Sequence, residues 1–172
     1  MKISYWELIG ILFISGIGVF LHFAYELANS SQYVALLALV NERLWEHLKM
    51  AFYGMIGYAL VEYIFIGNKH NNFIFAKAFS TLVACFLVVV LYYGYTHFLD
   101  PKVYLDIILF VVAILIAQLF SYAIIKLKLY MKGLNYIGLI VLVCGALLFA
   151  SYTYQPPTSG DLFHQQLTHH KK

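Results

Sequence analysis

The segment Val40–Lys49 reads VNERLWEHLK, and it determines how this chain is organised. Five ionisable side chains stand within eight of its residues, and the run that follows, residues 50–66, is almost entirely apolar. At helical spacing these side chains form two neighbouring stripes, Glu42, Glu46 and Lys49 on one and Arg43 and His47 on the other. The segment therefore predicts a helix that begins with a densely charged face and continues into a membrane.

The composition supports a membrane location. The chain has 172 residues, of which 63% are hydrophobic and 11% charged, and its mean hydropathy is +0.80. Soluble domains average about 45–50% apolar and about 25% charged residues. We therefore expect an all-α integral membrane protein that is embedded in the lipid bilayer. The net charge of +3 is small and scattered, so nucleic acid is not expected as a partner.

The hydropathy pattern predicts one five-helix transmembrane domain, residues 1–154, followed by a polar tail, 155–172. The expected spans cover about residues 5–26, 41–66, 73–98, 101–125 and 134–154. A continuous helix from Gln32 to Gly67 would exceed about 50 Å, whereas the hydrocarbon core is about 30 Å thick. We therefore expect a short interfacial or re-entrant segment at residues 34–40, a break near Asn41, and Asn41 as the cap of the second span. Asp100 before Pro101 predicts the cap of the fourth span.

Five crossings place the two termini on opposite faces of the membrane. The basic residues on the N-terminal face are Lys2, Lys69, Lys77, Lys126, Lys128 and Lys132, and those on the other face are Arg43, Lys49, Lys102, Lys171 and Lys172. Of the latter five, Arg43 and Lys49 lie among carboxylates in the sequence, and Lys171 and Lys172 end the tail. The positive-inside rule therefore favours a cytoplasmic N-terminus.

The same topology gathers polar residues on the face opposite the N-terminus. These are His22, Glu26, Asn41, Glu42, Glu46, His47, His97, Asp100, Asp106, Asp161 and His164. The N-terminal face has only Glu7 and Glu62 as acids, which we interpret as interfacial charges. An ionised side chain at the bilayer centre costs about 2.5–3.5 kcal/mol. His22 and His47, inside the expected boundary, should therefore face the bundle and find partners there.

The favoured hypothesis is a metal-dependent hydrolase acting on a lipid or lipid-linked substrate near the extracytoplasmic interface. His22, His47 and His97 would bind a divalent metal such as zinc, because catalytic zinc needs three protein ligands and an open position. Glu46 or Glu26 would act as the general base. The supporting residues would be Asn41, Glu42, Arg43, Lys49 and Asp100. No compact zinc motif such as H-E-x-x-H is present, so only the convergence of helices predicts the site.

Two other classes of function fit the same residues. A cation or small-solute site, in a transport protein or in the substrate-capturing subunit of a larger transporter, also uses bundle-facing carboxylates and histidines. Alternatively, the charged helix start is mutually paired and purely structural, with Asp106 pairing with Lys102. No charge lies in the middle of a span and no inverted repeat is evident, which disfavours a complete transporter.

The chain also resembles a known family. Its matching residues are His22-x-x-Tyr25-Glu26, the block Val40-Asn41-Glu42-x-x-Trp45-Glu46-His47-x-Lys49, and Pro156-Pro157 with Leu162-Phe163. The resemblance is to small bacterial multi-pass membrane proteins catalogued as a domain of unknown function. It covers nearly the whole chain and implies a compact helical membrane fold in a bacterial cytoplasmic membrane, without an activity. The tail departs from that pattern, because His164-Gln165 stands where the family continues with an Asp-Pro turn.

Overall fold

The computed structural model describes residues 2–41, 43–127, 132–155 and 157, and the regular structure in these ranges is helical. The five long helices are α1 (Ile3–Leu27), α3 (Leu44–Phe65), α4 (Phe73–Thr96), α5 (Val103–Lys126) and α6 (Lys132–Tyr154). All five are long and apolar enough to cross a membrane, since about 20 residues suffice. They suggest a multi-pass membrane protein, in agreement with the predicted spans.

The expected caps of two helices are wrong. The α3 helix begins at Leu44 with Arg43 as the capping residue, because the Asn41 side chain turns back and its Oδ1 accepts the Arg43 N–H at 3.2 Å. The α5 helix begins at Val103, beyond Asp100 and Pro101. Lys102 is still extended, and its N–H donates to the Tyr95 hydroxyl at 3.4 Å. Asn41 and Asp100 therefore belong to the loops before these helices.

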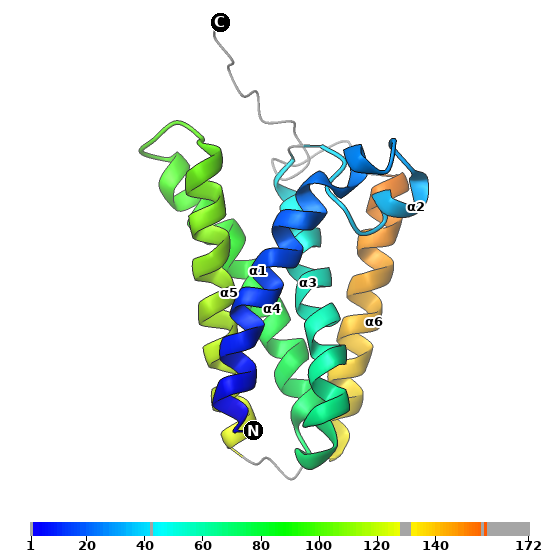
Figure 1. Ribbon diagram of the computed structural model, residues 1–172, viewed down its shortest axis with the longest axis vertical. Helices are drawn as coiled ribbons and strands as arrows, with labels where there is room; N and C mark the ends of the chain where they lie inside the picture. Colours follow the sequence, from blue (N-terminus) through cyan, green and yellow to red (C-terminus); the bar gives the residue numbers. More distant parts are fainter. Residues whose placement is uncertain (1, 42, 128–131, 156, 158–172) are drawn as a thin grey trace, which may run out of the picture.

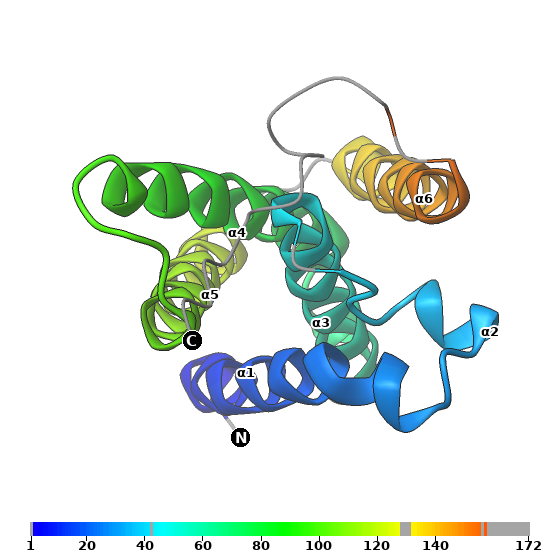
Figure 2. The ribbon, with the colours of Figure 1, turned by 90° about the horizontal axis from the view of Figure 1, so that it is seen from above.

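The long helices alternate in direction, so that the end of α1, the start of α3, the end of α4 and the start of α5 lie at one end of the bundle (Figure 1). Viewed along the bundle, α3 lies between α1 and α4, and α5 completes a group of four with them (Figure 2). α1 and α5 lie side by side near the N-terminus and diverge toward the other end (Figure 1).

The segment between α1 and α3 folds back into the bundle. Asn29 and Ser30, with φ of 50° and 59°, reverse the chain after α1, and the four-residue helix α2 (Gln32–Ala35) follows. Ala38 is fully buried against α1 and α3, and the Leu39 N–H donates to the Leu21 carbonyl at 3.1 Å. The predicted short segment before the second span is therefore present, and it packs against two helices.

A buried ion pair fastens this segment to α3. The Lys49 ammonium lies 2.7 Å from Glu46 Oε2 and donates to the Ala35 carbonyl at 2.7 Å. Glu46 Oε2 also accepts the N–H of Val40 at 3.1 Å. Both side chains are at most 1% exposed. Glu46 and Lys49, two members of the predicted stripe, therefore hold the folded-back segment in place and do not face solvent.

α6 lies outside the group of four, against α4 (Figure 2). Asn135 of α6 accepts a hydrogen bond from the Phe75 N–H through its Oδ1, at 3.1 Å. Phe75 lies in the first turn of α4, where backbone N–H groups have no carbonyl partner within the helix. The Nδ2 of Asn135 donates to the carbonyl of Asn71 at 2.6 Å. Asn71 lies in the connection after the short 3₁₀ helix η1 (Gly67–Lys69) that joins α3 to α4. Gly138 permits close contact, because a Cβ there would lie 2.9 Å from Phe75 Cα.

Candidate functional site

The first turn of α3 orients His47. Its Nδ1 lies 3.1 Å from the carbonyl oxygen of Arg43, one helical turn earlier. A carbonyl can only accept a hydrogen bond, so Nδ1 carries the proton in this contact. The neutral imidazole then has its lone pair on Nε2. The Arg43 carbonyl therefore fixes the orientation of the His47 ring.

His22 of α1 lies beside His47. The two ring centroids are 6.0 Å apart with an interplanar angle of 69°, and His22 also contacts the ring of Phe23 at 4.9 Å. Both histidines are half-buried. The end of α1 and the start of α3 thus bring two imidazoles into one site, as the alternating topology predicts.

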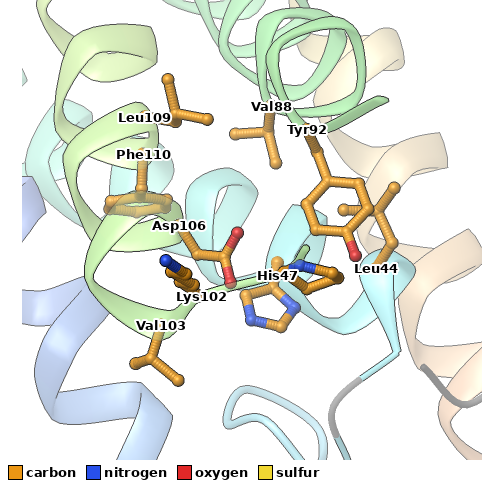
Figure 3. A pocket seen from close by; sticks show the side chains of 10 residues that line it. Leu44, His47, Val88, Tyr92, Lys102, Val103, Asp106, Leu109 and Phe110 are labelled. Carbon is orange, nitrogen blue, oxygen red and sulfur yellow. The ribbon is translucent and has the colours of Figure 1, made fainter. Parts of the chain in front are cut away.

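Asp106 of α5 completes the group. Its carboxylate points toward the His47 ring (Figure 3), and the Tyr95 hydroxyl of α4 donates to its Oδ1. Tyr95 in turn contacts Tyr92 edge-on at 5.5 Å. Two imidazoles and a carboxylate from α1, α3 and α5 therefore meet at one end of the bundle, and α4 supplies the hydroxyl that holds the carboxylate.

Two pockets are lined by both His47 and Asp106, with about 650 and about 610 Å³ of empty space including their open parts. Besides His47 and Asp106, the first is lined by Leu44, Val88, Tyr92, Pro101, Lys102, Val103, Leu109 and Phe110. The second, between α1 and α5, is lined by Ser15, Gly18, Val19, His22, Phe23, Met50, Val103, Ile107, Phe110 and Val111. Both have apolar walls with a few polar groups at one point, as small-molecule sites usually have.

Two further polar side chains border the pockets. Lys102 is exposed and lines the first, so it places a cation beside the imidazole and carboxylate groups. Ser15 lines the second, and its buried hydroxyl has no hydrogen-bond partner among the residues that the structure describes. A buried hydroxyl without a partner is costly, so Ser15 provides a binding group for a polar atom of a ligand.

Comparison with known sequences places the chain in a family. The model of the family of unknown function DUF6512 matches residues 1–171. The chain belongs to the DUF6512 family. No curated protein and no solved structure matches it. For this DUF6512 protein, the family membership defines no activity, so the function has to be inferred from the site itself.

Other residues predicted for the site lie apart from the pockets. His97 is exposed just beyond the end of α4 and contacts the Phe98 ring edge-on at 4.8 Å. Glu26 and Asp100 are also exposed, and none of the three lines either pocket. Across the described part of this DUF6512 chain, no three His, Cys, Asp or Glu side chains are grouped so that they could hold a metal. The three-histidine zinc site therefore stays a prediction, without an assembled ligand set.

The residues of the charged helix start serve two different purposes, one structural and one at the pockets. Glu46 and Lys49 form the buried pair that fastens the α2 segment, and neither lines a pocket. Arg43 orients His47 through its backbone carbonyl, not through its charge. Glu42, and the tail residues 158–172 with Asp161 and His164, lie outside the described residues. Glu46, predicted as a general base, thus has a structural partner, and among the described ionisable side chains of this segment only His47 lines the pockets.

Asp106 is the main residue that the site prediction omitted. Its spacing of four from Lys102 explained it as half of a surface ion pair, whereas its carboxylate points toward His47 and accepts the hydrogen bond of the Tyr95 hydroxyl. Asp106 lies about one helical turn inside α5 and is the only acidic residue of that helix. A carboxylate inside the boundary requires a partner, and that requirement was the signal that could have identified it.

Proposed function

We propose that this DUF6512 protein is a membrane hydrolase that binds a lipid or lipid-linked substrate in the pockets around His22, His47 and Asp106. One observation supports the proposal above the others. The His47 imidazole is oriented by a backbone carbonyl, has a carboxylate pointing at it, and stands at the end of an apolar slot between helices. This arrangement combines a proton acceptor with walls that suit acyl chains.

The chemistry proposed for the site is general acid–base catalysis. His47 Nε2 would take a proton from a water molecule while that water attacks an ester bond of the substrate. The imidazolium that forms would be stabilised by the Asp106 carboxylate, which Tyr95 holds in position. The same imidazolium would then return the proton to the leaving alcohol. Such proton transfer contributes roughly 10²–10⁴-fold to a rate.

Binding would use both kinds of surface in the pockets. The walls provided by Leu109, Phe110 and Ile107 suit hydrocarbon chains. Lys102 would attract an anionic headgroup, and the Ser15 hydroxyl and His22 would contact its neutral oxygens. The substrate class that fits this distribution of charge is an anionic lipid or a lipid-linked phosphate.

Zinc is not assigned a step in this mechanism. A zinc-dependent reaction would require a third ligand close to His22 and His47, and the described residues do not form such a set. Transport of a cation or small solute, and a purely structural role, remain the competing classes of function. Both classes predict that the protein has no hydrolytic activity that a substitution at His47 could lower.

The location of the protein is part of the proposal. A bacterial cytoplasmic membrane with a cytoplasmic N-terminus is proposed from the family resemblance and from the distribution of lysines. The pockets then open near the extracytoplasmic interface, because His22 and His47 lie at the end of the bundle opposite the N-terminus (Figure 1). Headgroups of the outer leaflet would lie at the same level.

The test uses the full chain in vesicles made from the total lipid extract of its expression host. Release of headgroup or acyl products is followed by mass spectrometry for the unmodified protein, His47→Gln and His97→Gln. We expect products from the unmodified protein and from His97→Gln, and a loss of roughly 10²–10⁴-fold in His47→Gln. Equal activity of the two variants, or no product from the unmodified protein, would contradict the proposal.

A further inference from the structure

A second group of charged side chains lies at the opposite end of the bundle. Glu7 of α1, Glu62 of α3 and Lys77 of α4 are 5%, 0% and 2% exposed. They are buried between helices, about one turn inside the helix ends, a burial that the interpretation of the two glutamates as interfacial charges did not anticipate. Fifteen residues of α1 separate Glu7 from His22, which is about 22 Å, so this cluster is separate from the pockets.

Lys77 donates hydrogen bonds to Glu7 and forms an ion pair with Glu62. Its Nζ lies 2.9 Å from each oxygen of Glu7 and 2.5 Å from Oε2 of Glu62. An ammonium group has three N–H donors and no acceptor. Two of these donors serve Glu7, and neither oxygen of Glu62 accepts a hydrogen bond from the residues that the structure describes.

The neighbouring hydroxyl groups are also engaged elsewhere. Ser121 of α5 donates to Glu7 Oε1 at 2.7 Å, and the Tyr58 hydroxyl of α3 donates to the carbonyl of Trp6. The hydroxyls of Ser80 and Thr81 on α4 both donate to the Lys77 carbonyl, at 3.1 and 2.7 Å. The donors around the cluster thus serve Glu7 and the backbone, and not Glu62 Oε1.

Three buried acceptors of the cluster have no hydrogen-bond donor among the described residues, namely both oxygens of Glu62 and Oε1 of Gln118. Gln118 of α5 is 1% exposed and lies beside Glu7, to whose carbonyl its Nε2 donates at 3.4 Å. Charged or titratable groups on the elements around the cluster are Glu7 on α1, Tyr58 and Glu62 on α3, and Lys77 on α4, while α5 contributes the neutral Ser121 and Gln118. Two carboxylates and one ammonium leave one excess negative charge in a buried site with unsatisfied acceptors.

We propose that the Glu7–Lys77–Glu62 cluster is a site that binds one proton, shared between its two carboxyl groups. Burial disfavours an uncompensated charge, and two carboxylates in one site cannot easily both be ionised. One proton on the pair leaves one carboxylate against one ammonium, which is neutral, and it supplies the donor that the cluster lacks. Because the two carboxyl groups are coupled through Lys77, the proton belongs to the pair and not to one residue.

The same end of the bundle offers a route for the proton. A pocket with about 840 Å³ of empty space, including its open part, is lined by His70, Asn71, Phe73 and Asn135 among others. The Phe73 ring forms one wall of this pocket, and its centroid lies 5.5 Å from the Lys77 ammonium. Phe73 thus lies in contact with both the pocket and the cluster, so the proton would exchange with the face that carries the N-terminus.

Infrared difference spectroscopy of the full chain in lipid nanodiscs near neutral pH tests the proposal through the C=O stretch of a protonated carboxylic acid. We expect one such group per chain in the unmodified protein. Glu62→Gln and Glu7→Gln should each abolish it, because the remaining glutamate then pairs with Lys77 one to one. Lys77→Met should double it, since both carboxyl groups become protonated.

The controls are matched by residue type. Glu26→Gln and Lys69→Met change exposed side chains, and Asp106→Asn removes the pocket carboxylate, so all three should retain one band. Absence of the band from the unmodified protein, or its persistence in both glutamate variants, would overturn the proposal. The spectrum of the unmodified protein requires no variant to fold. The result is also independent of the lipid hydrolysis assay, which concerns the other end of the bundle.

Discussion

The imidazole rings of His22 and His47 lie 6.0 Å apart, although the whole α2 segment separates them in the sequence. Their register depends on that segment. The Leu39 N–H binds the Leu21 carbonyl of α1, next to His22. Glu46, next to His47, accepts the N–H of Val40. The segment therefore sets the distance between the two histidines from both sides, and the buried ion pair on α3 is a part of the site's scaffold.

The first prediction concerns that ion pair. Lys49→Met should destabilise the protein by about 3–5 kcal/mol, because it leaves the Glu46 carboxylate buried without its cation. Adding Glu46→Gln to the same chain should recover a part of this loss. Thermal unfolding in detergent measures both effects. Lys69→Met, at an exposed lysine, should change little, and an equally small effect of Lys49→Met would contradict the assigned role.

The second prediction compares two glycines of α1. A Cβ at Gly18 would lie 2.6 Å from the Phe110 ring, and both residues line the pocket between α1 and α5. Gly18→Ala should displace the ring and weaken substrate binding by about tenfold, since a packing conflict costs about 1–3 kcal/mol. At Gly16 no atom lies within 4 Å of a Cβ. The apparent KM for lipid should therefore rise in Gly18→Ala and stay constant in Gly16→Ala.

The third prediction concerns the attachment of α6. A Cβ at Gly138 would lie 2.9 Å from Phe75 Cα and 3.0 Å from the Ile74 carbonyl oxygen. Backbone atoms cannot move aside as a side chain can, so Gly138→Ala should push α6 from α4 and cost about 1–3 kcal/mol. Gly133, on the same helix, has open space at its Cβ. If Gly133→Ala lowered the unfolding temperature as much, the close contact between α4 and α6 would be refuted.

The fourth prediction addresses the metal. His22 and His47 are close together, but His97 is exposed beyond α4. We therefore expect elemental analysis of the purified chain to find less than one equivalent of zinc, and dialysis against a chelator to leave hydrolysis unchanged. One equivalent of zinc that is lost in His47→Ala would instead support the metal-dependent mechanism, with a third ligand from a residue such as Glu42, outside the described ranges.

Much of the fold follows from the sequence. The five apolar runs, the short segment before the second span and the gathering of His22 and His47 at one end all follow from hydropathy and alternating direction. The observed helix starts, Leu44 and Val103, do not follow from the sequence. A hydrogen bond from the Arg43 N–H to the Asn41 side chain precedes the first, and a hydrogen bond from the Lys102 N–H to the Tyr95 hydroxyl precedes the second, so the helices begin later than expected at Asn41 and Pro101. Such local contacts have no periodic pattern.

The division of the polar residues into sites could be predicted only in part. Glu46 and His47 are neighbours in the sequence, yet one faces the α2 segment and the other the pockets. That difference depends on which element packs against each side of α3. The Glu7, Glu62 and Lys77 cluster depends on three helices meeting, and the spacing of these residues within their own helices carries no sign of it. Tertiary packing, and not local sequence, determines both outcomes.

The most direct test of the central claim is a double-mutant cycle for lipid hydrolysis by the unmodified protein, His47→Gln, Asp106→Asn and the double variant. If the imidazole and the carboxylate act as one unit, the double variant should be no slower than His47→Gln alone. Asp100→Asn, an exposed carboxylate outside the pockets, should retain full activity. Losses that multiply in the double variant, or an Asp106→Asn variant as active as Asp100→Asn, would contradict a shared site.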